Sequence, residues 1–285
     1  MDFVKFSSIQ MSDPLKKSIA EIGYDVATSI QSQAIPVILN GKDVIGLSQT
    51  GSGKTAAFGV PIVDRVDLSL DPRMVQALIV CPTRELALQS CGELRKFAKY
   101  KEGVNIVSVF GGDSFSRQLT RLKTGCQIVV GTPGRIMDHM RRRTLHLEEI
   151  RTVVLDEADE MLKMGFLEDI ETILASTPES RQMLLFSATM PREIMNITAR
   201  FQKEPVTIKI EHAQKTVSTI EQYYTVLPRG KKNETLYSLI EFYKPGAAIV
   251  FCNTKKMVDE LVEELNRHHY AARGQIGRAS CRERV

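Results

Sequence analysis

Short apolar runs rich in β-branched residues alternate with helical stretches along the first 210 residues of the chain. Six such runs lie at residues 77–81, 104–110, 127–130, 152–155, 183–186 and 206–210. A helix between two strands brings the chain back to the start of the sheet, so that the next strand runs parallel to the previous one. This alternation therefore predicts a parallel sheet with helices packed on it. The expected fold class is therefore α/β, and open sheets of this kind bind ligands beyond the carboxyl ends of their strands.

One loop between a predicted strand and a predicted helix has the composition of a phosphate-binding loop. An apolar run at 43–47 precedes it, and a helix is expected to start at 55–58. The loop consists of Ser48, Gln49, Thr50, Gly51, Ser52, Gly53, Lys54 and Thr55. Glycines let backbone N–H groups close around phosphates, Lys54 can reach the β and γ oxygens, and Thr55 offers a hydroxyl to Mg²⁺. Ser48 stands where the general pattern has glycine, so the match depends on the last three residues and the flanking elements.

Two acids, Asp156 and Glu157, follow the apolar run at 152–155. By itself, an acid pair after a strand is most often a strand end that enters solvent. After a phosphate loop, Asp156 can instead hold the shell of a Mg²⁺ ion, partly through water, and Glu157 can orient an attacking water. The sequence therefore predicts an ATP-hydrolysing site with Lys54, Asp156 and Glu157 as catalytic residues. Thr55 and Asp156 are the expected Mg²⁺ ligands.

Residues 156–159 read Asp-Glu-Ala-Asp. Together with the phosphate loop, they make the chain resemble the DEAD-box family of ATP-dependent RNA helicases, of the bacterial type. The resemblance runs from Phe6 to about Arg273, and the matching segments occur in family order. It implies a RecA-like parallel sheet flanked by helices, followed by a second RecA-like domain that is incomplete here. It also implies that ATP, Mg²⁺ and RNA are bound.

Phe6 and Gln31, with Gly23 and Tyr24 between them, resemble the family segment that reads adenine. The segment departs from the family at Ala27, where members usually carry proline. An amide such as Gln31 can donate to one adenine edge atom and accept from the exocyclic amine, and Phe6 could cover the ring. A glutamine outside this context would more often be a solvated helix residue.

The resemblance further implies an RNA grip and a coupling segment. The expected RNA contacts are Pro82, Thr83, Arg84, Gly111, Gly112, Thr132, Pro133, Gly134 and Arg135. Hydroxyl and backbone N–H donors at strand-to-helix turns bind phosphates without reading sequence, and the two arginines would add charge. Without these motifs, an arginine at a helix start is more often merely solvated. The coupling set is Asp159, Ser187, Ala188 and Thr189, whose hydroxyls the resemblance places near Asp159.

A polar stretch follows the last predicted strand of this region. The expected organisation is a RecA-like helicase ATP-binding domain at 1–210 and a linker at 211–219. A partial helicase C-terminal domain at 220–275 and an adapter-derived, non-native tail at 276–285 are expected to follow. Helices are expected at 234–242 and 256–267, and a strand at 248–252. The tail lacks strand or helix periodicity and reads codon by codon as a sequencing adapter. A real basic tail is the alternative.

Composition permits this organisation. With 285 residues, 43% hydrophobic and 25% charged, the chain can bury the cores of one or two domains. No apolar run approaches the ~18 residues of a membrane span, and the first residues lack the charge pattern of a signal peptide, so a cytoplasmic location is expected. The net charge of +4 is too small to indicate nucleic-acid binding by itself.

Three functions remain open from the sequence. The favoured one is an ATP-dependent RNA helicase that binds ATP, Mg²⁺ and single-stranded RNA and separates short duplexes. The second is a truncated fragment that binds ATP and RNA without helicase activity. The third is a DNA translocase with the same ATPase machinery, which the Asp-Glu-Ala-Asp and Gln31 segments disfavour. Contacts to the 2′-OH distinguish RNA from DNA, and spacing along a sequence does not reveal them.

Overall fold

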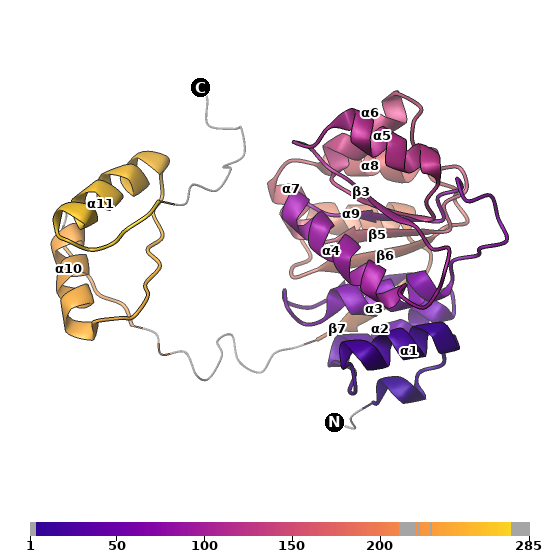
Figure 1. Cartoon of the computed structure of the whole chain (residues 1–285), viewed down its shortest axis with the longest axis horizontal. Coiled ribbons are helices and arrows are strands. Elements are labelled where there is room, and N and C mark those ends of the chain that lie inside the picture. The colour runs from indigo at the N-terminus through magenta and orange to yellow at the C-terminus, as the bar shows by residue number, and fades with distance from the viewer. Residues whose placement is uncertain (1–3, 211–220, 222, 229, 275–285) are drawn as a thin grey trace. The chain divides into compact units, whose positions relative to one another are not determined.

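The computed structural model describes residues 4–210, 221, 223–228 and 230–274. The chain divides into two compact units, Met1–His212 and Ala213–Val285 (Figure 1). The expected linker at 211–219 and the expected adapter-derived tail at 276–285 lie outside the described residues, so both stay predictions. None of the helices in the described ranges is long and apolar enough to cross a membrane.

The first unit is built on a seven-stranded sheet in which every neighbouring pair of strands is parallel. The strand order is β3-β4-β2-β5-β6-β1-β7. The strands are β1 Val44–Leu47, β2 Ala77–Val80, β3 Ile106–Val109, β4 Ile128–Gly131, β5 Thr152–Asp156, β6 Gln182–Ser187 and β7 Val206–Lys209. Each predicted run overlaps one strand, which confirms the expected parallel α/β sheet.

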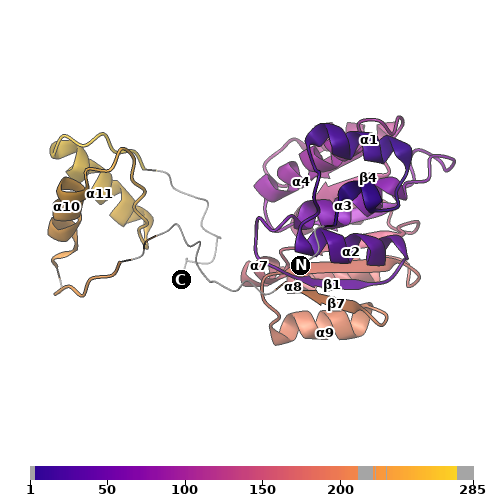
Figure 2. The same ribbon diagram turned by 90° about the horizontal axis from the view of Figure 1, so that it is seen from below.

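Helices cover both faces of this sheet. They are the 3-10 helix Phe6–Ser8, α1 Asp13–Ile22, α2 Ser29–Leu39, α3 Lys54–Asp64, α4 Arg84–Phe97, α5 Phe115–Thr124, α6 Pro133–Arg141, α7 Ala158–Lys163, α8 Leu167–Ala175 and α9 Arg192–Phe201. Alternate strand residues point to opposite faces, so the core is split in two. One cluster joins the sheet to α1–α4 and the other joins it to α5–α9, and Figure 2 shows α2 and α9 on opposite sides of β1 and β7. Because both faces are covered, the central strands are apolar throughout.

The strand order decides which loops become neighbours at the carboxyl edge of the sheet. β6 lies between β1 and β5, so the loops after these three strands meet on one side. These loops carry the phosphate loop, Glu157 and Ala188. β4 lies between β3 and β2 on the other side, and the loops after these strands carry the expected RNA contacts. We call the first group the nucleotide half of the edge and the second the RNA half.

The described residues of the second unit contain two helices, α10 Lys232–Tyr243 and α11 Lys255–Arg267, which confirm the helices expected at 234–242 and 256–267. The strand expected at 248–252 is wrong, because its residues form no strand and Ile249 and Phe251 are 83% and 92% exposed. A strand requires hydrogen bonds from a neighbour. The described residues of this unit contain no other strand that could supply them.

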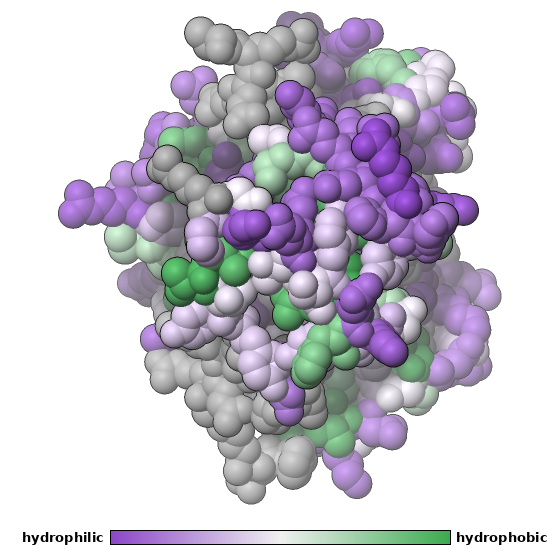
Figure 3. Space-filling view, turned by 90° about the vertical axis from the view of Figure 1, so that its left-hand side faces the viewer, coloured by the Kyte–Doolittle hydropathy of each residue, from purple (hydrophilic) through white to green (hydrophobic). Residues whose placement is uncertain are grey.

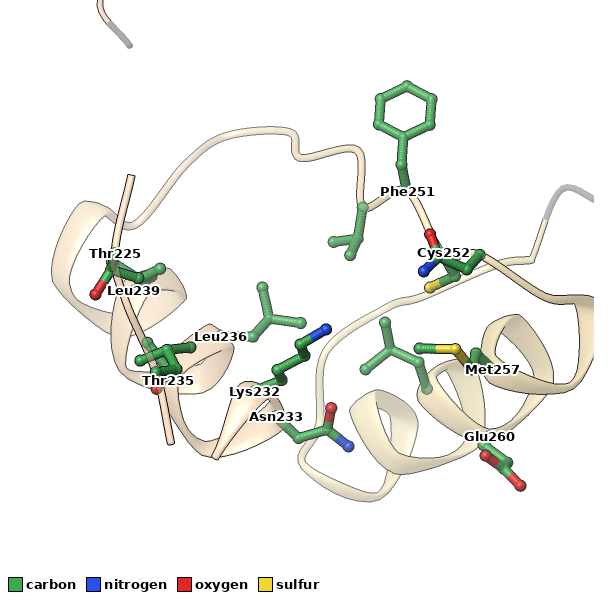
Figure 4. A pocket seen from close by; sticks show the side chains of 14 residues that line it. Thr225, Lys232, Asn233, Thr235, Leu236, Leu239, Phe251, Cys252, Met257 and Glu260 are labelled. Carbon is green, nitrogen blue, oxygen red and sulfur yellow. The ribbon is translucent and has the colours of Figure 1, made fainter. Parts of the chain in front are cut away.

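The apolar residues of the second unit are therefore poorly covered. Leu265 is the only buried residue among those described in this unit. A pocket of about 410 Å³ opens between α10, α11 and two extended segments, and Figure 4 shows Phe251 directed away from it. Hydrophobic groups also reach the surface on the face drawn in Figure 3. The described residues of this unit do not form a closed core by themselves.

Candidate functional site

The phosphate loop has the backbone geometry that its glycines predict. Gly51 and Gly53 have φ values of 82° and 94°, in the left-handed region that side chains disfavour. Gly53 caps α3, and Lys54 is the first residue of that helix. The positive end of the helix dipole and the free N–H groups of its first turn therefore lie beside the loop, where an anion is stabilised.

Lys54 and Glu157 form an ion pair in the nucleotide half. Lys54 Nζ lies 2.8 Å from Glu157 Oε1, and the two side chains are only 5% and 11% exposed. Lys54 also donates to Ser48 O at 3.2 Å, and Thr50 Oγ1 donates to Glu157 Oε1 at 3.0 Å. The loop thus satisfies its own charged groups, so a phosphate that reaches Lys54 must replace contacts to Glu157 and Ser48. Two predicted catalytic residues from distant segments are brought together here.

Glu157 occupies a strained backbone position. It caps α7 with φ and ψ both 52°, the left-handed conformation that costs a residue with a side chain about 1–2 kcal/mol. Such strain persists when surrounding contacts impose it and is concentrated at functional sites. The end of β5 and the start of α7 impose it here, and the carboxylate lies against Lys54 and Thr50.

Asp156, the last residue of β5, has the properties of a metal-shell ligand. Its Oδ1 is buried and has no hydrogen-bond partner in the structure. Burial raises the pKa of Asp156 to about 7, against the opposing charge of Lys54 and together with the like charge of Glu157. A divalent cation or its bound water would supply the missing partner and favour the carboxylate. The residues present therefore fit Mg²⁺, with Thr55 at the start of α3 as the second expected ligand.

Gln31 joins the predicted adenine segment to the phosphate loop. Its Oε1 accepts from Thr28 N at 2.9 Å and its Nε2 donates to Gly53 O at 3.1 Å. A Cβ on Gly53 would lie 2.3 Å from that Nε2, so only glycine allows this approach. Phe6 is 3% exposed and packs against Tyr24 with ring centroids 5.7 Å apart. Its role against an adenine ring stays a prediction, and its burial leaves little of its face free.

The coupling residues are hydrogen-bonded to one another. Thr189 donates to Asp159 Oδ2 from both its N–H, at 3.1 Å, and its hydroxyl, at 2.8 Å. Asp159 N donates to Ser187 Oγ at 3.2 Å, and Ser187 Oγ donates to Thr189 O at 2.7 Å. Burial raises the pKa of Asp159, but these hydrogen bonds outweigh it and the pKa is lowered. The carboxylate is thus kept ionised, while Ala188 lies exposed between the two hydroxyl residues.

The RNA half presents neutral donors at helix starts. Thr83 caps α4, where its Oγ1 accepts from Leu86 N at 3.2 Å and its own hydroxyl proton remains available. Thr132 precedes α6 with a side chain that makes no capping bond, and Gly112 adopts a φ of 83°. The remaining expected RNA contacts of this half lie in the same loops and helix starts, namely Pro82, Gly111, Pro133 and Gly134.

The two arginines of this half differ. Arg84 is exposed and lies over the ring of Phe110, with Cζ 4.9 Å from the centroid. The side chain of Arg135 is only 13% exposed. Its Nη1 donates to Asp113 O at 3.2 Å and to Gln118 Oε1 at 3.0 Å. In this structure Arg135 ties α6 to the loop that contains Gly112, so its charge is largely withdrawn from solvent.

Two residues that sequence reasoning missed complete this network. Gln118 is fully buried and donates from Nε2 to Phe110 O at 3.0 Å. His139, also fully buried, stacks on Phe115 and lies 3.3 Å from Gln118 Oε1 through Nε2. Because that oxygen only accepts, the contact assigns the proton to Nε2. One signal was available in the sequence: Gln118 precedes the buried Leu122 by four residues and therefore shares the apolar face of α5.

The comparisons with known proteins agree with this geometry. A family model described as DEAD/DEAH box helicase matches residues 28–197. The chain is 49% identical over 272 residues to the DEAD-box ATP-dependent RNA helicase CshA of Bacillus cereus, with 95% of this chain and 51% of that protein covered. It is 49% identical over 280 residues to the CshA helicase of Geobacillus kaustophilus, with 98% and 59% covered. The chain thus spans about half the length of these curated relatives.

A solved structure supports the fold. A DEAD box protein from the hyperthermophile Methanococcus jannaschii is similar with a TM-score of 0.70 and 36% identity, and 95% of this chain and 72% of that chain are covered. Together with the seven-stranded parallel sheet, this similarity confirms the expected RecA-like fold. The second unit, with its two helices and no strand among the described residues, agrees with the expected incomplete second domain.

Proposed function

This chain belongs to the DEAD/DEAH box helicase family, and we propose on that premise that it binds ATP with Mg²⁺ and single-stranded RNA. In the whole protein, ATP hydrolysis would drive the separation of short RNA duplexes. The observation that carries the proposal is the contact between Lys54 and Glu157 at 2.8 Å. This contact supports the proposal because a cation suited to phosphate and a carboxylate suited to water lie together at the sheet edge, next to Asp156, whose Oδ1 has no hydrogen-bond partner.

Each residue of the nucleotide half has a distinct task in this proposal. Lys54 neutralises phosphate charge and Glu157 orients the attacking water. Asp156 and Thr55 would hold Mg²⁺, partly through water, and the ion would supply further neutralisation of the phosphates when bound. Gln31 would hydrogen-bond to the edge of the adenine base. Its contact with Gly53 O would link the bound base to the phosphate loop. Asp159, Ser187 and Thr189 would couple this half to RNA.

The RNA half would grip the sugar–phosphate backbone without reading bases. Its expected donors are hydroxyls and backbone N–H groups at the starts of α4 and α6. Such contacts position a strand and carry no sequence information. Little sequence specificity follows. The adjacency of β5 and β2 joins the two halves, so nucleotide and RNA can be held on one sheet edge.

A narrower function is supported for the 285-residue chain as it stands. Its second unit has no strand among the described residues and leaves Ile249 and Phe251 exposed. A catalytic group must be held to within about 0.5 Å, which requires a packed supporting shell. We therefore propose that this chain binds ATP and RNA through its first unit and shows little RNA-stimulated turnover. Unwinding would belong to the whole protein.

Titration of a fluorescent ATP analogue into this chain tests the nucleotide site, with Lys54→Ala as the variant and Lys96→Gln as the matched control on an exposed helix face. Saturable binding that needs Mg²⁺ and Lys54 is expected. RNA and DNA of equal sequence, titrated separately with the analogue present, test the second ligand. Absence of nucleotide binding, or stronger binding of DNA than of RNA, would contradict the proposal.

A further inference from the structure

One pocket of the first unit, which we call the basic pocket, lies at the opposite edge of the sheet from the nucleotide and RNA halves. It has a volume of about 440 Å³ and is formed by the ends of α5 and α6 and by the segments that precede β2 and β5. Its floor is apolar, with Val75, Leu122 and Leu145 at 5%, 8% and 5% exposed. The volume lies within the roughly 300–1,000 Å³ typical of ligand sites.

The rim of the basic pocket is cationic. It carries Arg73, Lys123, Arg143 and His146 and no acid among the residues that line it. Arg73 is paired with Asp71, and His146 lies 3.7 Å from Glu148. Within the described part of the chain, no carboxylate forms an ion pair with Lys123 or Arg143. Two fixed positive charges therefore face the pocket without a counter-charge.

Arg143 holds a backbone position that favours glycine. Its φ is 52°, directly after the end of α6, where its N–H donates to Met140 O. Glycine is the usual residue at this left-handed position after a helix, and a side chain there is disfavoured. Folding alone therefore gives no reason for arginine at this position. A strained residue that carries an unpaired charge on the rim of a pocket suggests a role in binding.

We propose that the basic pocket is a docking site for an acidic peptide segment that carries an aliphatic side chain. The aliphatic group would enter the apolar floor, and the flanking carboxylates would pair with Lys123 and Arg143. Recognition of single-stranded RNA relies chiefly on the rings of Phe, Tyr and Trp, which stack with bases, and none of these lines this pocket. The imidazole among its lining residues, His146, lies beside Glu148. Charge and shape together therefore favour a peptide over RNA.

The position of the pocket makes its occupancy compatible with nucleotide binding. Its lining residues precede β2, β4 and β5, whereas the phosphate loop and Glu157 follow β1 and β5. The amino and carboxyl ends of parallel strands lie at opposite edges of the sheet. An acidic partner can therefore bind while ATP occupies the other edge, and the two ligands should not compete.

Fluorescence anisotropy with the 285-residue chain tests the proposal. The probes are labelled nonapeptides with one central leucine, isoleucine or valine between acidic residues, a matched peptide with central alanine, and a peptide with lysine in place of each acid. The variants are Arg143→Gly and Lys123→Gln, with Lys96→Gln as the control that removes an equal charge elsewhere. A thermal melt of each variant accompanies the titrations, and labelled oligouridylate is the RNA probe.

At least one aliphatic acidic peptide should bind, unaffected by ATP, with affinity about tenfold lower in Arg143→Gly and in Lys123→Gln, as expected for the loss of one charge-assisted contact. Arg143→Gly should melt no lower than the wild type, because glycine suits that backbone. Lys96→Gln should bind normally. The proposal is overturned if no acidic peptide binds, if the alanine peptide binds equally, or if Arg143→Gly leaves peptide affinity unchanged. Loss of oligouridylate affinity instead of peptide affinity would overturn it in favour of an RNA surface.

Discussion

The nucleotide half and the RNA half lie on one edge of one sheet, yet they would hold their proposed ligands by different means. The nucleotide half concentrates buried charge: Lys54 and Glu157 pair directly, and Asp156 is buried. The RNA half offers neutral donors at Thr83 and Thr132 and withdraws the charge of Arg135 into a buried network. Electrostatic interactions between buried charges are stronger because their surroundings have a low dielectric constant. Hydrogen bonds from neutral donors to a phosphate backbone are weaker and less specific. Substitutions in the nucleotide half should therefore reduce activity far more than substitutions in the RNA half.

The largest effect is expected from Lys54→Ala in the whole protein. The backbone cradle survives, but the positive charge at the phosphates is lost and Glu157 keeps no cation beside it. Turnover should fall by about 10²–10³-fold, the usual loss for one preorganised donor, and ATP should bind more weakly. Steady-state ATPase rates and nucleotide titration measure both. ATP affinity equal to that of the wild type would remove Lys54 from phosphate binding.

Glu157→Gln should separate binding from chemistry. The amide keeps the shape of the side chain but cannot orient water as the carboxylate does, so turnover should fall by about 10²-fold. ATP affinity should be kept or increased, because the competing ion pair at Lys54 is weakened. The check is a single-turnover measurement beside an equilibrium titration, with Glu160→Gln on the exposed side of α7 as the control. Normal turnover would contradict the assigned role.

Arg135→Ala and Arg84→Ala should affect different properties of the RNA half: the first should lower stability, and the second should weaken RNA binding. Loss of Arg135 removes the donor to Asp113 O and Gln118 Oε1, so the free energy of unfolding should fall by roughly 1–3 kcal/mol. Arg84 is exposed, so its loss should leave the free energy of unfolding unchanged. The slope of log K for RNA binding against log salt concentration should become smaller by about 1, as expected for one lost phosphate contact. Denaturant titrations and RNA binding at several salt concentrations distinguish them. Identical behaviour of the two variants would erase the distinction.

Gln31→Ala tests the link between base reading and the phosphate loop. Each lost hydrogen bond is worth roughly 0.5–1.5 kcal/mol, so ATP affinity should fall by about tenfold and the gap between ATP and GTP should narrow. Gln33→Ala on the same helix serves as the control. Titration of both nucleotides decides the matter. An unchanged preference for ATP would mean that another group reads the base.

The smallest effect is expected from pH acting on His139. Burial, reinforced by Arg135 and Arg142, lowers the pKa of His139 to about 4, below its unfolded value near 6.5. The unfolded chain therefore takes up a proton before the native state does. The stabilisation from neutral His139 is complete above pH 6.5 and declines as the pH falls toward 4, by roughly 1 kcal/mol at pH 5.5. Denaturant titrations of wild type and His139→Gln at pH 8 and 5.5 measure it, and the variant should lose less stability.

Much of the fold followed from local patterns. Apolar runs predicted all seven strands of the first unit, because a strand buried on both faces needs a continuous apolar stretch. The phosphate loop followed from Gly53, Lys54 and Thr55, since few other structures use that combination. The strand expected at 248–252 failed for a physical reason: its apolar sequence has strand propensity, but no neighbour pairs with it in the described residues.

The sequence predicted which residues form the candidate site better than it predicted their burial and their hydrogen-bond partners. Exposure of Arg84 and burial of Arg135 could not be distinguished from their motifs, because both follow a strand and start a helix. The polar core of Gln118 and His139 was missed, since buried polar residues resemble surface ones until their partners are known. Gln31 was expected to face a base, and the structure shows that it also holds Gly53 O.

The sequence by itself determined the chemical groups of this protein and the short elements that carry them. Phosphate loop, acid pair and helix starts are encoded within a few residues each, where local geometry and side-chain chemistry suffice. The tertiary structure alone decided which groups meet. β6 lies between β1 and β5, and this placement closes Lys54 onto Glu157 and Thr189 onto Asp159. Strand order and burial depend on packing between segments that are distant in the chain, and no local pattern encodes them.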